Sequence, residues 1–305
     1  MKLIKPSFEI LSQESGIDGI KKMIELAGRT CYKSEDKITK DSSTKFVQML
    51  IDRQHFAMLE HGTVYLIIAK SVAKFNEYRF YQKNKYSRVF EDENHYYITT
   101  NYRIIVENNR EEDLKYLTFP FKYHEKRIAV KFNTQIAISR EFNRHRADSI
   151  AESSTRYCNY SKDKFGNEIT INIPSWIKES EVHTDYDLIE KEAFSYPCIL
   201  DKEGLPNGFS QVIYEQEIYY WEAFDWWLWA NKCAELAYMN LIRLGWTAQQ
   251  ARTILPLDTN TELIHTAFVS DWKHFFSLRC VEAAHPDARE LSIPLQEQFK
   301  LLKLI

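Results

Sequence analysis

Glycine is scarce in this chain, with 8 residues among 305, whereas about 7% is the average share. None of the eight belongs to a G-x-G-x-x-G fingerprint or to a phosphate-binding P-loop. A Rossmann-type dinucleotide fold is therefore not expected. If the protein binds phosphate groups, side-chain cations or helix ends must hold them.

Further absences narrow the class of protein. The five cysteines are odd in number, widely spaced and never paired as C-x-x-C, which argues for reduced thiols and against a disulfide frame or a zinc site. The N-terminus lacks the apolar region of a signal peptide, and no apolar run approaches the roughly 18 residues of a membrane span. The net charge of −3 gives no general affinity for nucleic acid. We expect a cytoplasmic protein without membrane or nucleic-acid partners.

Apolar periodicity and turn residues predict an α+β fold in which a mixed sheet carries segregated helices. We expect a single domain over residues 1–305, with 158–212 as a family-variable insert. One helix should begin at Gln135 and carry Arg140 and Arg144, and Pro294 should interrupt the last helix. Thr247 and Gln250 form a capping box at a helix start. Strands are expected near 3–10, 63–68 and 128–132, a hairpin at 96–106, and helices near 19–27, 42–54 and 214–244, from 270, and from 286.

The segment 140–157 concentrates four arginines and one histidine in eighteen residues. Arg140 and Arg144 would repel each other on one helix, and an anion between them would relieve that repulsion. Thr155 and Arg156 follow on a predicted loop, where hydroxyl, backbone N–H and guanidinium groups suit phosphate binding. Glu152 is the carboxylate in the middle of the group. The composition alone favours a solvated basic helix end, and it is the arrangement of these residues that favours a binding site.

The run R-H-R-A-D-S-I-A-E-S-S-T-R-Y at 144–157 resembles the signature of flavin-dependent thymidylate synthases (the ThyX family), R-H-R-x-x-S-x-N-E-x-S-x-R-Y. Ala151 stands where the family has asparagine. Three further blocks resemble the same family in the same order, so the likeness covers roughly residues 55–290. They are H-F-A-M-L-E-H at 55–61, with Ala57 in place of a threonine, A-R-T-I-L-P at 251–256, and D-W-K-H-F-F-S-L-R at 271–279, with Asp271 in place of an arginine.

This resemblance implies a homotetramer with active sites at the subunit interfaces. It implies methylation of dUMP to dTMP, with methylene-tetrahydrofolate as carbon donor and FAD reduced by NADPH. Arg279 would be catalytic, facing the uracil ring. The residues that would bind dUMP are Glu141, Arg144, Glu152, Ser153, Ser154, Thr155, Arg156, Arg252 and Arg279. The residues that would bind FAD are His55, Ala57, Arg144, His145, Arg146, Glu152, Phe268, Ser270 and His274.

Two departures from the family pattern bear on these roles. Glu141 stands where some relatives place a glutamine that contacts the nucleotide, and its carboxylate would repel a phosphate, so we expect it to pair with Arg140 or Arg144. Ala57 and Ala151 remove polar contacts to the flavin. His55 and His61 have no third metal ligand at useful spacing, and we expect both to be packed and hydrogen-bonded beside the flavin.

Three other functions compete with this interpretation. Pro197-Cys198 superficially resembles the cysteine site of conventional thymidylate synthases, although Ile199 stands where histidine is needed. The Arg/His cluster with interleaved aromatic residues would also suit nucleic-acid binding. A relative that binds flavin and nucleotide without methylating is the third alternative.

Overall fold

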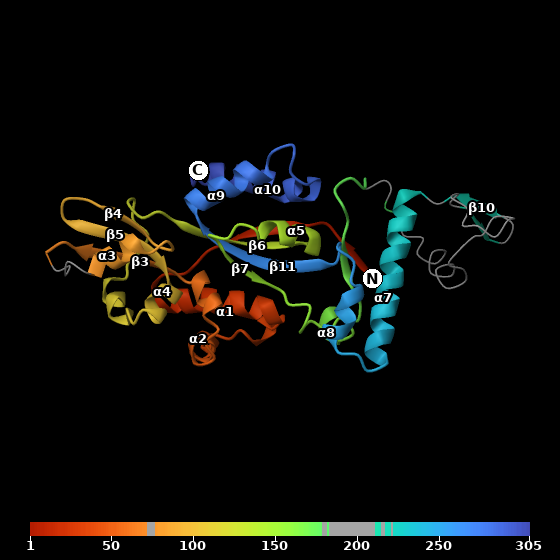
Figure 1. Ribbon diagram of the computed structural model, residues 1–305, viewed down its shortest axis with the longest axis horizontal. Coiled ribbons are helices and arrows are strands. Elements are labelled where there is room, and N and C mark those ends of the chain that lie inside the picture. The colour runs from red at the N-terminus through yellow and green to blue at the C-terminus, as the bar shows by residue number, and fades with distance from the viewer. Residues whose placement is uncertain (72–76, 179–181, 183–210, 215–216, 221) are drawn as a thin grey trace. The chain divides into compact units, whose positions relative to one another are not determined.

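The computed structural model describes residues 1–71, 77–178, 182, 211–214, 217–220 and 222–305 (Figure 1). The chain divides into two compact units. The smaller unit comprises Met1–Lys5 and Thr155–Asn260, and the larger comprises Pro6–Ser154 and Thr261–Ile305. Both contain helices and strands, which confirms the predicted α+β class.

The larger unit holds a four-stranded sheet of order β2-β6-β11-β7 and a three-stranded sheet of order β3-β5-β4. The strands are β2 (Ser7–Leu11), β3 (Thr63–Ala69), β4 (Arg88–Glu91), β5 (His95–Asn101), β6 (Arg127–Gln135), β7 (Ser149–Glu152) and β11 (Asn260–Phe268), whose first residue belongs to the smaller unit. The helices are α1 (Gly16–Tyr32), α2 (Ser42–Asp52), α3 (Glu77–Lys83), α4 (Tyr102–Glu107), α5 (Ile136–Phe142), α9 (Val269–Arg279) and α10 (Pro286–Leu301).

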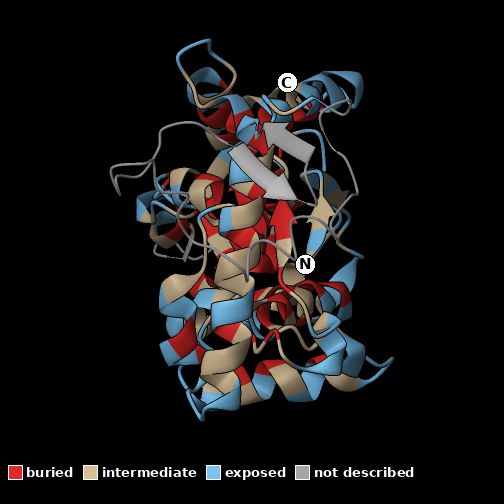
Figure 2. Ribbon diagram, turned by 90° about the vertical axis from the view of Figure 1, so that its right-hand side faces the viewer, coloured by how far each residue is buried: buried red, intermediate tan, exposed pale blue. Residues whose placement is uncertain are grey.

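The four-stranded sheet lies between α1 on one face and α9 with α10 on the other (Figure 1). Successive side chains of a strand point to opposite faces of the sheet, so β6 contributes apolar side chains to the cores on both faces. Val130 and Phe132 pack in the core that contains Trp272 of α9. Ala129 packs with Met23 of α1 on the opposite face. Helices in Figure 2 are accordingly buried along one side and exposed along the other.

The three-stranded sheet has its own core, to which α1 also contributes. β3 and β5 pair antiparallel, with Leu66 opposite Ile98. Both side chains are buried in one cluster with Ile20 and Ile24 of α1. Gly62 immediately precedes β3, and a Cβ atom there would lie 2.7 Å from the side chains of both isoleucines. The close approach of α1 to this sheet therefore requires glycine at this position.

The smaller unit is built around a long helix, α7 (Ala223–Arg243). Strand β1 (Lys2–Ile4) pairs in parallel with β8 (Thr170–Asn172), and β9 (Gln211–Tyr214) pairs antiparallel with β10 (Glu217–Tyr220). Gly245 follows α7 with a φ of +96°, and helix α8 (Ala248–Ala251) begins with the predicted capping box of Thr247 and Gln250. Tyr238 of α7 is fully buried in the core of this unit.

The structure corrects several predicted boundaries. The expected N-terminal strand is two strands, β1 and β2, which belong to different sheets. The expected hairpin at 96–106 is strand β5 followed directly by α4, because the Asn101 side chain accepts a hydrogen bond from the Ile104 amide and caps a helix. The helix predicted from Tyr214 begins at Ala223, after β10.

Helix α10 runs through Pro294, where an interruption was predicted. Pro294 is exposed, while Leu291 and Leu295 on either side are buried in the core. The burial of these leucines stabilises both halves of the helix against the lost backbone hydrogen bond. Most of the predicted insert 158–212, including Cys198, lies outside the described residues. Among the residues that are described, no helix has the length and apolar character needed to cross a bilayer.

Candidate functional site

The signature segment 144–157 is divided among a turn, a strand and a loop. Helix α5 ends at Phe142, and Arg144 lies in the turn that follows, with its amide bonded to the Glu141 carbonyl oxygen at 3.3 Å. The prediction that Arg140 and Arg144 share one helix is therefore wrong. Strand β7 then runs antiparallel to β11, with Glu152 opposite Leu263.

Three hydrogen bonds hold the carboxylate of Glu152 in place. Its Oε1 accepts from the Ser139 hydroxyl at 2.6 Å and from the Thr261 hydroxyl at 3.1 Å, and its Oε2 accepts from Asn143 Nδ2 at 2.9 Å. The donors come from α5, from the residue after α5 and from β11. Such a shell fixes both carboxylate oxygens in direction. None of the three donors was predicted, and only Asn143, within the basic run, had any sequence signal.

Arg279, at the end of α9, is bound to Glu141 of α5. Its Nη1 lies 2.8 Å from Glu141 Oε2, and its Nη2 donates to the Glu141 carbonyl oxygen at 2.7 Å. The side chains of Arg279 and Glu141 are 15% and 31% exposed. Glu141 was expected to pair with Arg140 or Arg144, and this expectation is incorrect. The end of α9 packs against the last turn of α5, so Arg279 supplies the nearer cation.

His145 completes this group on its buried side. Its Nε2 accepts from Arg279 Nε at 3.2 Å, and its ring centroid lies 6.0 Å from that of His274. Burial lowers the pKa of His145 to about 4, with further lowering from the charges of His265 and Arg279. The imidazole is therefore neutral at pH 7, which is the form that can accept a hydrogen bond from a guanidinium.

Three arginines around this group carry uncompensated charge. Arg140, Arg144 and Arg146 are exposed. Within the described residues, none of their side chains forms a hydrogen bond or an ion pair. Guanidinium groups in this state can bind phosphate in a bidentate geometry without first breaking an internal contact. This part of the larger unit thus fits an anionic ligand.

The block 55–61 forms a 3-10 turn at Phe56–His61. His61 is buried, and its Nδ1 lies 2.9 Å from the Thr266 hydroxyl, as expected of a packed histidine. His55 is exposed, so the expectation that it is packed is wrong: it precedes the turn and its side chain remains in solvent. Ala57 is also exposed.

Ala151, which replaces the family's asparagine, is only 1% exposed. It pairs with Ile264 on β11 and packs with Met23 and Ala27 of α1. An amide side chain in this apolar contact would lose its hydration. The departure from the family pattern is therefore consistent with the local packing against α1.

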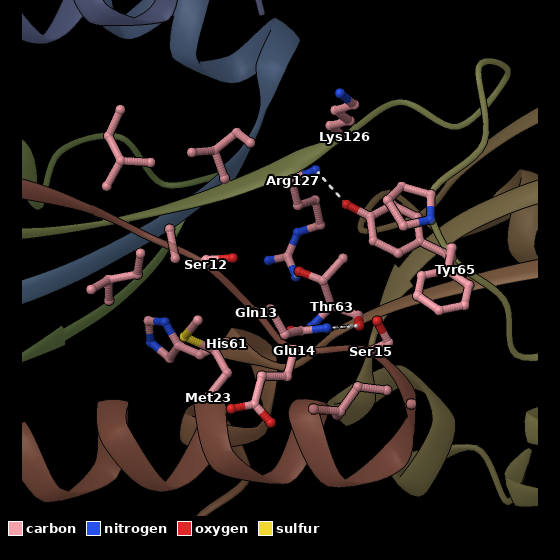
Figure 3. Close-up of a pocket in the computed structure, with 18 of the residues that line it drawn as sticks. Ser12, Gln13, Glu14, Ser15, Met23, His61, Thr63, Tyr65, Lys126 and Arg127 are labelled. Atoms are coloured by element: carbon pink, nitrogen blue, oxygen red, sulfur yellow. Dashed lines mark hydrogen bonds between the residues drawn. The ribbon is translucent and has the colours of Figure 1, made fainter. Parts of the chain in front are cut away.

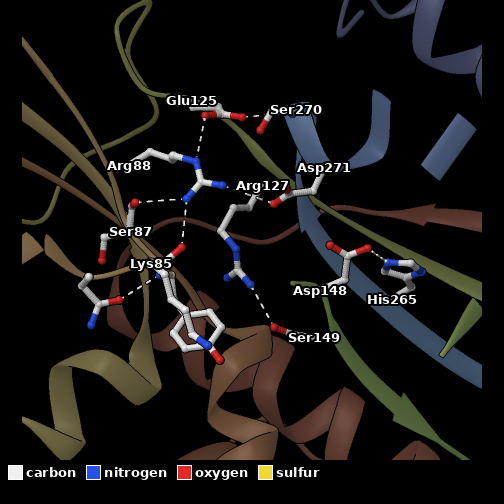
Figure 4. Close-up of polar contacts among 12 residues, drawn as sticks. Lys85, Ser87, Arg88, Glu125, Arg127, Asp148, Ser149, His265, Ser270 and Asp271 are labelled. Carbon is white, nitrogen blue, oxygen red and sulfur yellow. Dashed lines mark hydrogen bonds and ion pairs between the residues drawn. The ribbon is translucent and has the colours of Figure 1, made fainter. Parts of the chain in front are cut away.

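The start of α9 is engaged in contacts within the larger unit (Figure 4). The Ser270 amide donates to Glu125 Oε1 at 2.9 Å, and Arg88 lies 3.5 Å from carboxylate oxygens of both Glu125 and Asp271. The Arg88 guanidinium carbon also lies 4.3 Å from the ring centroid of Phe268. Asp271 of α9 stands where the family has arginine, and in this chain it forms an ion pair with Arg88 of β4.

The remaining predicted residues belong to two places. Ser153 and Ser154, in the larger unit, are tied to the end of α1: the Ser153 hydroxyl donates to the Thr30 carbonyl oxygen, and the Ser154 amide to that of Cys31. Thr155, Arg156 and Arg252, which were also predicted to bind dUMP, lie in the smaller unit. Within it, Arg252 Nη1 donates to the Thr155 hydroxyl at 3.2 Å, and Arg156 Nε donates to Gln249 Oε1 at 3.0 Å.

The partners of Arg156 and Arg252 are neutral and both arginines are exposed, so neither guanidinium has a carboxylate partner among the residues of the smaller unit that the structure describes. Arg144 and Arg279 belong to the larger unit. A shared cradle of all four arginines therefore stays a prediction.

The family profile described as "Thymidylate synthase complementing protein" matches residues 120–302 of this chain. The match spans more than half of the chain and includes the signature segment. The chain belongs to this family.

Individual relatives are more distant. A flavin-dependent thymidylate synthase from Synechocystis is 36% identical over 62 residues, which are 20% of this chain. The chain spans 29% of the length of that relative. Among solved structures, the UMP/dUMP methylase PolB from Streptomyces cacaoi bound with 5-Br UMP is 14% identical, with a TM-score of 0.42 over 99% of this chain and 92% of that one. The same methylase bound with 5-Br dUMP is 16% identical, with a TM-score of 0.39 over 100% and 93%.

Proposed function

We propose that this protein is a flavin-dependent thymidylate synthase. The reaction is dUMP plus methylene-tetrahydrofolate plus NADPH and a proton, giving dTMP, tetrahydrofolate and NADP⁺. A bound FAD supplies the hydride that reduces the transferred methylene to a methyl group. The protein supplies binding, orientation and electrostatic stabilisation. Family membership and the blocks of similarity in the chain support this proposal.

The exposed arginines bind the anionic groups. Arg144 and Arg146 suit the phosphates of the flavin, and Arg156, Thr155 and Arg252 suit the phosphate of dUMP, because each of these guanidinium groups lacks a carboxylate partner among the residues described. His145, as a neutral buried imidazole, forms a wall of the flavin site and positions Arg279. We further propose a homotetramer in the cytoplasm, with each chain folded as one functional domain.

Two residues act on the pyrimidine in this proposal. Glu152 presents a carboxylate that three donors hold in one orientation, which suits a hydrogen bond to ribose or base. Arg279 stabilises the negative charge that develops on the uracil ring as the base is activated. For this role Arg279 has to leave Glu141, or share its guanidinium with it. Ser154 binds phosphate and is not a nucleophile, since no His–Asp pair is proposed to activate it.

One observation carries the proposal: uncompensated arginines lie in the signature segment together with a carboxylate that is fixed on both oxygens. The test is spectroscopic. Purified protein should show the visible absorption of oxidised flavin, and NADPH should bleach it under anaerobic conditions. Adding dUMP and methylene-tetrahydrofolate should restore the absorption while dTMP forms, measured by mass spectrometry.

A matched pair of variants localises the effect. Arg144→Gln should reduce flavin content and dTMP formation, whereas Arg243→Gln, an exposed arginine at the end of α7, should leave both unchanged. Flavin binding without dTMP would indicate the relative that does not methylate. Thiol alkylation that inactivates, with protection by dUMP, would indicate a cysteine mechanism. Tight, steeply salt-dependent binding of nucleic acid by a flavin-free protein would contradict the proposal.

A further inference from the structure

A cavity of about 510 Å³ lies within the larger unit (Figure 3). None of the residues proposed to bind dUMP or FAD lines it. Its walls come from the end of β2, the loop into α1, strands β3 and β6, residues 117–120 and the C-terminal tail. Its volume falls within the range of pockets that hold small organic ligands, roughly 300–1,000 Å³.

The ionisable residues of the cavity leave it with net positive charge. Arg127 and Lys126 contribute cations. Glu14 is the acidic residue of the lining, and Lys22 neutralises it through an ion pair of 2.7 Å. Burial lowers the pKa of His61 to about 3, with the charge of Arg127 as a second cause, so this histidine is neutral at pH 7. The interior therefore attracts an anion.

Arg127 is the charged group inside the cavity. Its side chain points from β6 toward Thr63 (Figure 3), and the residue is 8% exposed. Its Nη1 donates to the Glu60 carbonyl oxygen at 2.9 Å and to the Thr63 hydroxyl at 3.3 Å, and its Nη2 donates to the Ser149 hydroxyl at 3.1 Å. In the described part of the chain, Arg127 forms no ion pair.

Part of the hydrogen-bonding capacity of Arg127 is left over. A guanidinium has five N–H groups, and the three bonds above leave the Nε–H and one N–H of Nη2. Nε is buried without a hydrogen-bond partner among the described residues, as is Nε2 of His61 on the neighbouring wall. The carboxylates of Glu60, Asp148 and Asp271 act on the guanidinium charge, but among the described residues none lies within ion-pair distance of it. A buried cation with unused donors and no direct carboxylate partner is costly, and a bound anion would offset that cost.

The rest of the lining is mostly apolar and includes Leu11, Met23, Leu117, Ile128 and Leu304. Such a wall does not suit inorganic phosphate or another small, strongly hydrated ion. The N-terminus of α1, a helix of 17 residues, opens onto the same space at Ser15 and Gly16 and adds positive potential there. The lining thus combines one anion-binding corner with an extended apolar surface.

We propose that this cavity binds a small amphipathic carboxylate, with its carboxylate on Arg127 and its hydrocarbon body against the apolar wall. None of the residues proposed to bind flavin or nucleotide lines this cavity, but Phe268 of the proposed FAD set borders it, with its ring centroid 5.4 Å from the Arg127 guanidinium carbon. The ligand class follows from the lining: one unpaired buried guanidinium selects one carboxylate group, and the apolar surface selects an aliphatic or aromatic body over a sugar or a polyanion.

The test uses octanoate and 1-octanol, which differ mainly in charge. Isothermal titration calorimetry on the full-length protein should show octanoate binding with a Kd at least about tenfold lower than that of 1-octanol, because only octanoate can form the charge-assisted bonds. Arg127→Met should remove this preference. Circular dichroism of the variant shows whether it folds, since Arg127 also ties Glu60 to Ser149.

A second pair of variants does not depend on the folding of Arg127→Met. Lys126→Glu reverses an exposed cation at the cavity, and Lys122→Glu makes the same change on an exposed lysine outside the lining. Octanoate should bind several-fold more weakly to Lys126→Glu than to Lys122→Glu, while 1-octanol should not distinguish them. The proposal is refuted if octanoate does not bind at millimolar concentration, if both probes bind alike, or if both lysine variants weaken octanoate equally.

Discussion

Replacing Glu141 by glutamine should strengthen the binding of dUMP. In the free protein the Glu141 carboxylate holds Arg279 Nη1 at 2.8 Å, and this is the arginine proposed to face the uracil ring. The nucleotide must compete with that carboxylate for the guanidinium. Glutamine keeps the shape of the side chain but removes its charge, so the competition becomes weaker.

The size of the effect follows from the contact. A hydrogen bond to a charged group contributes about 1.5–3 kcal/mol and a neutral one about 0.5–1.5 kcal/mol, so the substitution changes the contact by about 1 kcal/mol. The 31% exposure of Glu141 places the effect toward the lower end through solvent screening. The bond from Nη2 to the Glu141 carbonyl oxygen is unaffected. A change of about 1 kcal/mol corresponds to roughly fivefold tighter binding.

The assay is calorimetric titration of dUMP into wild-type protein and Glu141→Gln. Glu282→Gln serves as the control, because it removes one negative charge at an exposed position of the same unit. The control should bind dUMP like the wild type. Unchanged or weaker binding by Glu141→Gln would show that Glu141 does not compete with the nucleotide, and that it positions Arg279 or has no part in binding.

Three further outcomes are expected. The pKa values of His145 and His61 are lowered to about 4 and about 3, so the unfolded chain binds more protons than the folded one below pH 6.5. The free energy of unfolding should therefore fall by up to about 1.4 kcal/mol per pH unit for each histidine as the pH drops from 6.5 toward 4. Urea denaturation at pH 7, 6 and 5 should show that the stability of His145→Gln depends less on pH than that of the wild type. Ala151→Asn restores the family residue, yet it should lower the free energy of unfolding by about 1–3 kcal/mol because the new amide is buried. Ala57→Thr, at an exposed position, should change the midpoint of urea denaturation little. Ser139→Ala should lower kcat for dTMP formation by about tenfold with little change in flavin content, since one of the donors that orient the Glu152 carboxylate is lost. An unchanged kcat would show that the reaction does not depend on that orientation.

The sequence predicted best those features that depend on local chemistry. The capping box of Thr247 and Gln250 was correct because both hydrogen bonds form within four residues. The α+β class followed from apolar periodicity. The predicted helix ran past the end of α5, where the amides of residues 144 and 145 turn to the carbonyl groups three residues back. In that turn, the Asn143 side-chain amide donates to Glu152, nine residues along the chain. Sequence spacing carries no information on that contact.

Contacts between distant elements were the least predictable. The partner of Glu141 was sought among its neighbours in sequence, but Arg279 lies 138 residues away and reaches it through the packing of α9 on α5. The Ser139 and Thr261 donors of the carboxylate shell had no pattern to reveal them. The cavity also lacked a motif, since Arg127 is an isolated arginine on a strand. The residues of the signature could be found from the sequence because they form one continuous segment that resembles the family pattern.

Helix α1 joins two parts of the larger unit that differ in chemistry. It has 17 residues, so it extends for roughly 25 Å. Its first turn borders the cavity at Gly16, and the carbonyl groups of Thr30 and Cys31 at its far end anchor Ser153 and Ser154. A rigid-body tilt of this helix would move both of its ends. A small tilt of its first turn is therefore also a displacement of the two anchors, and the loop that leaves β7 must follow.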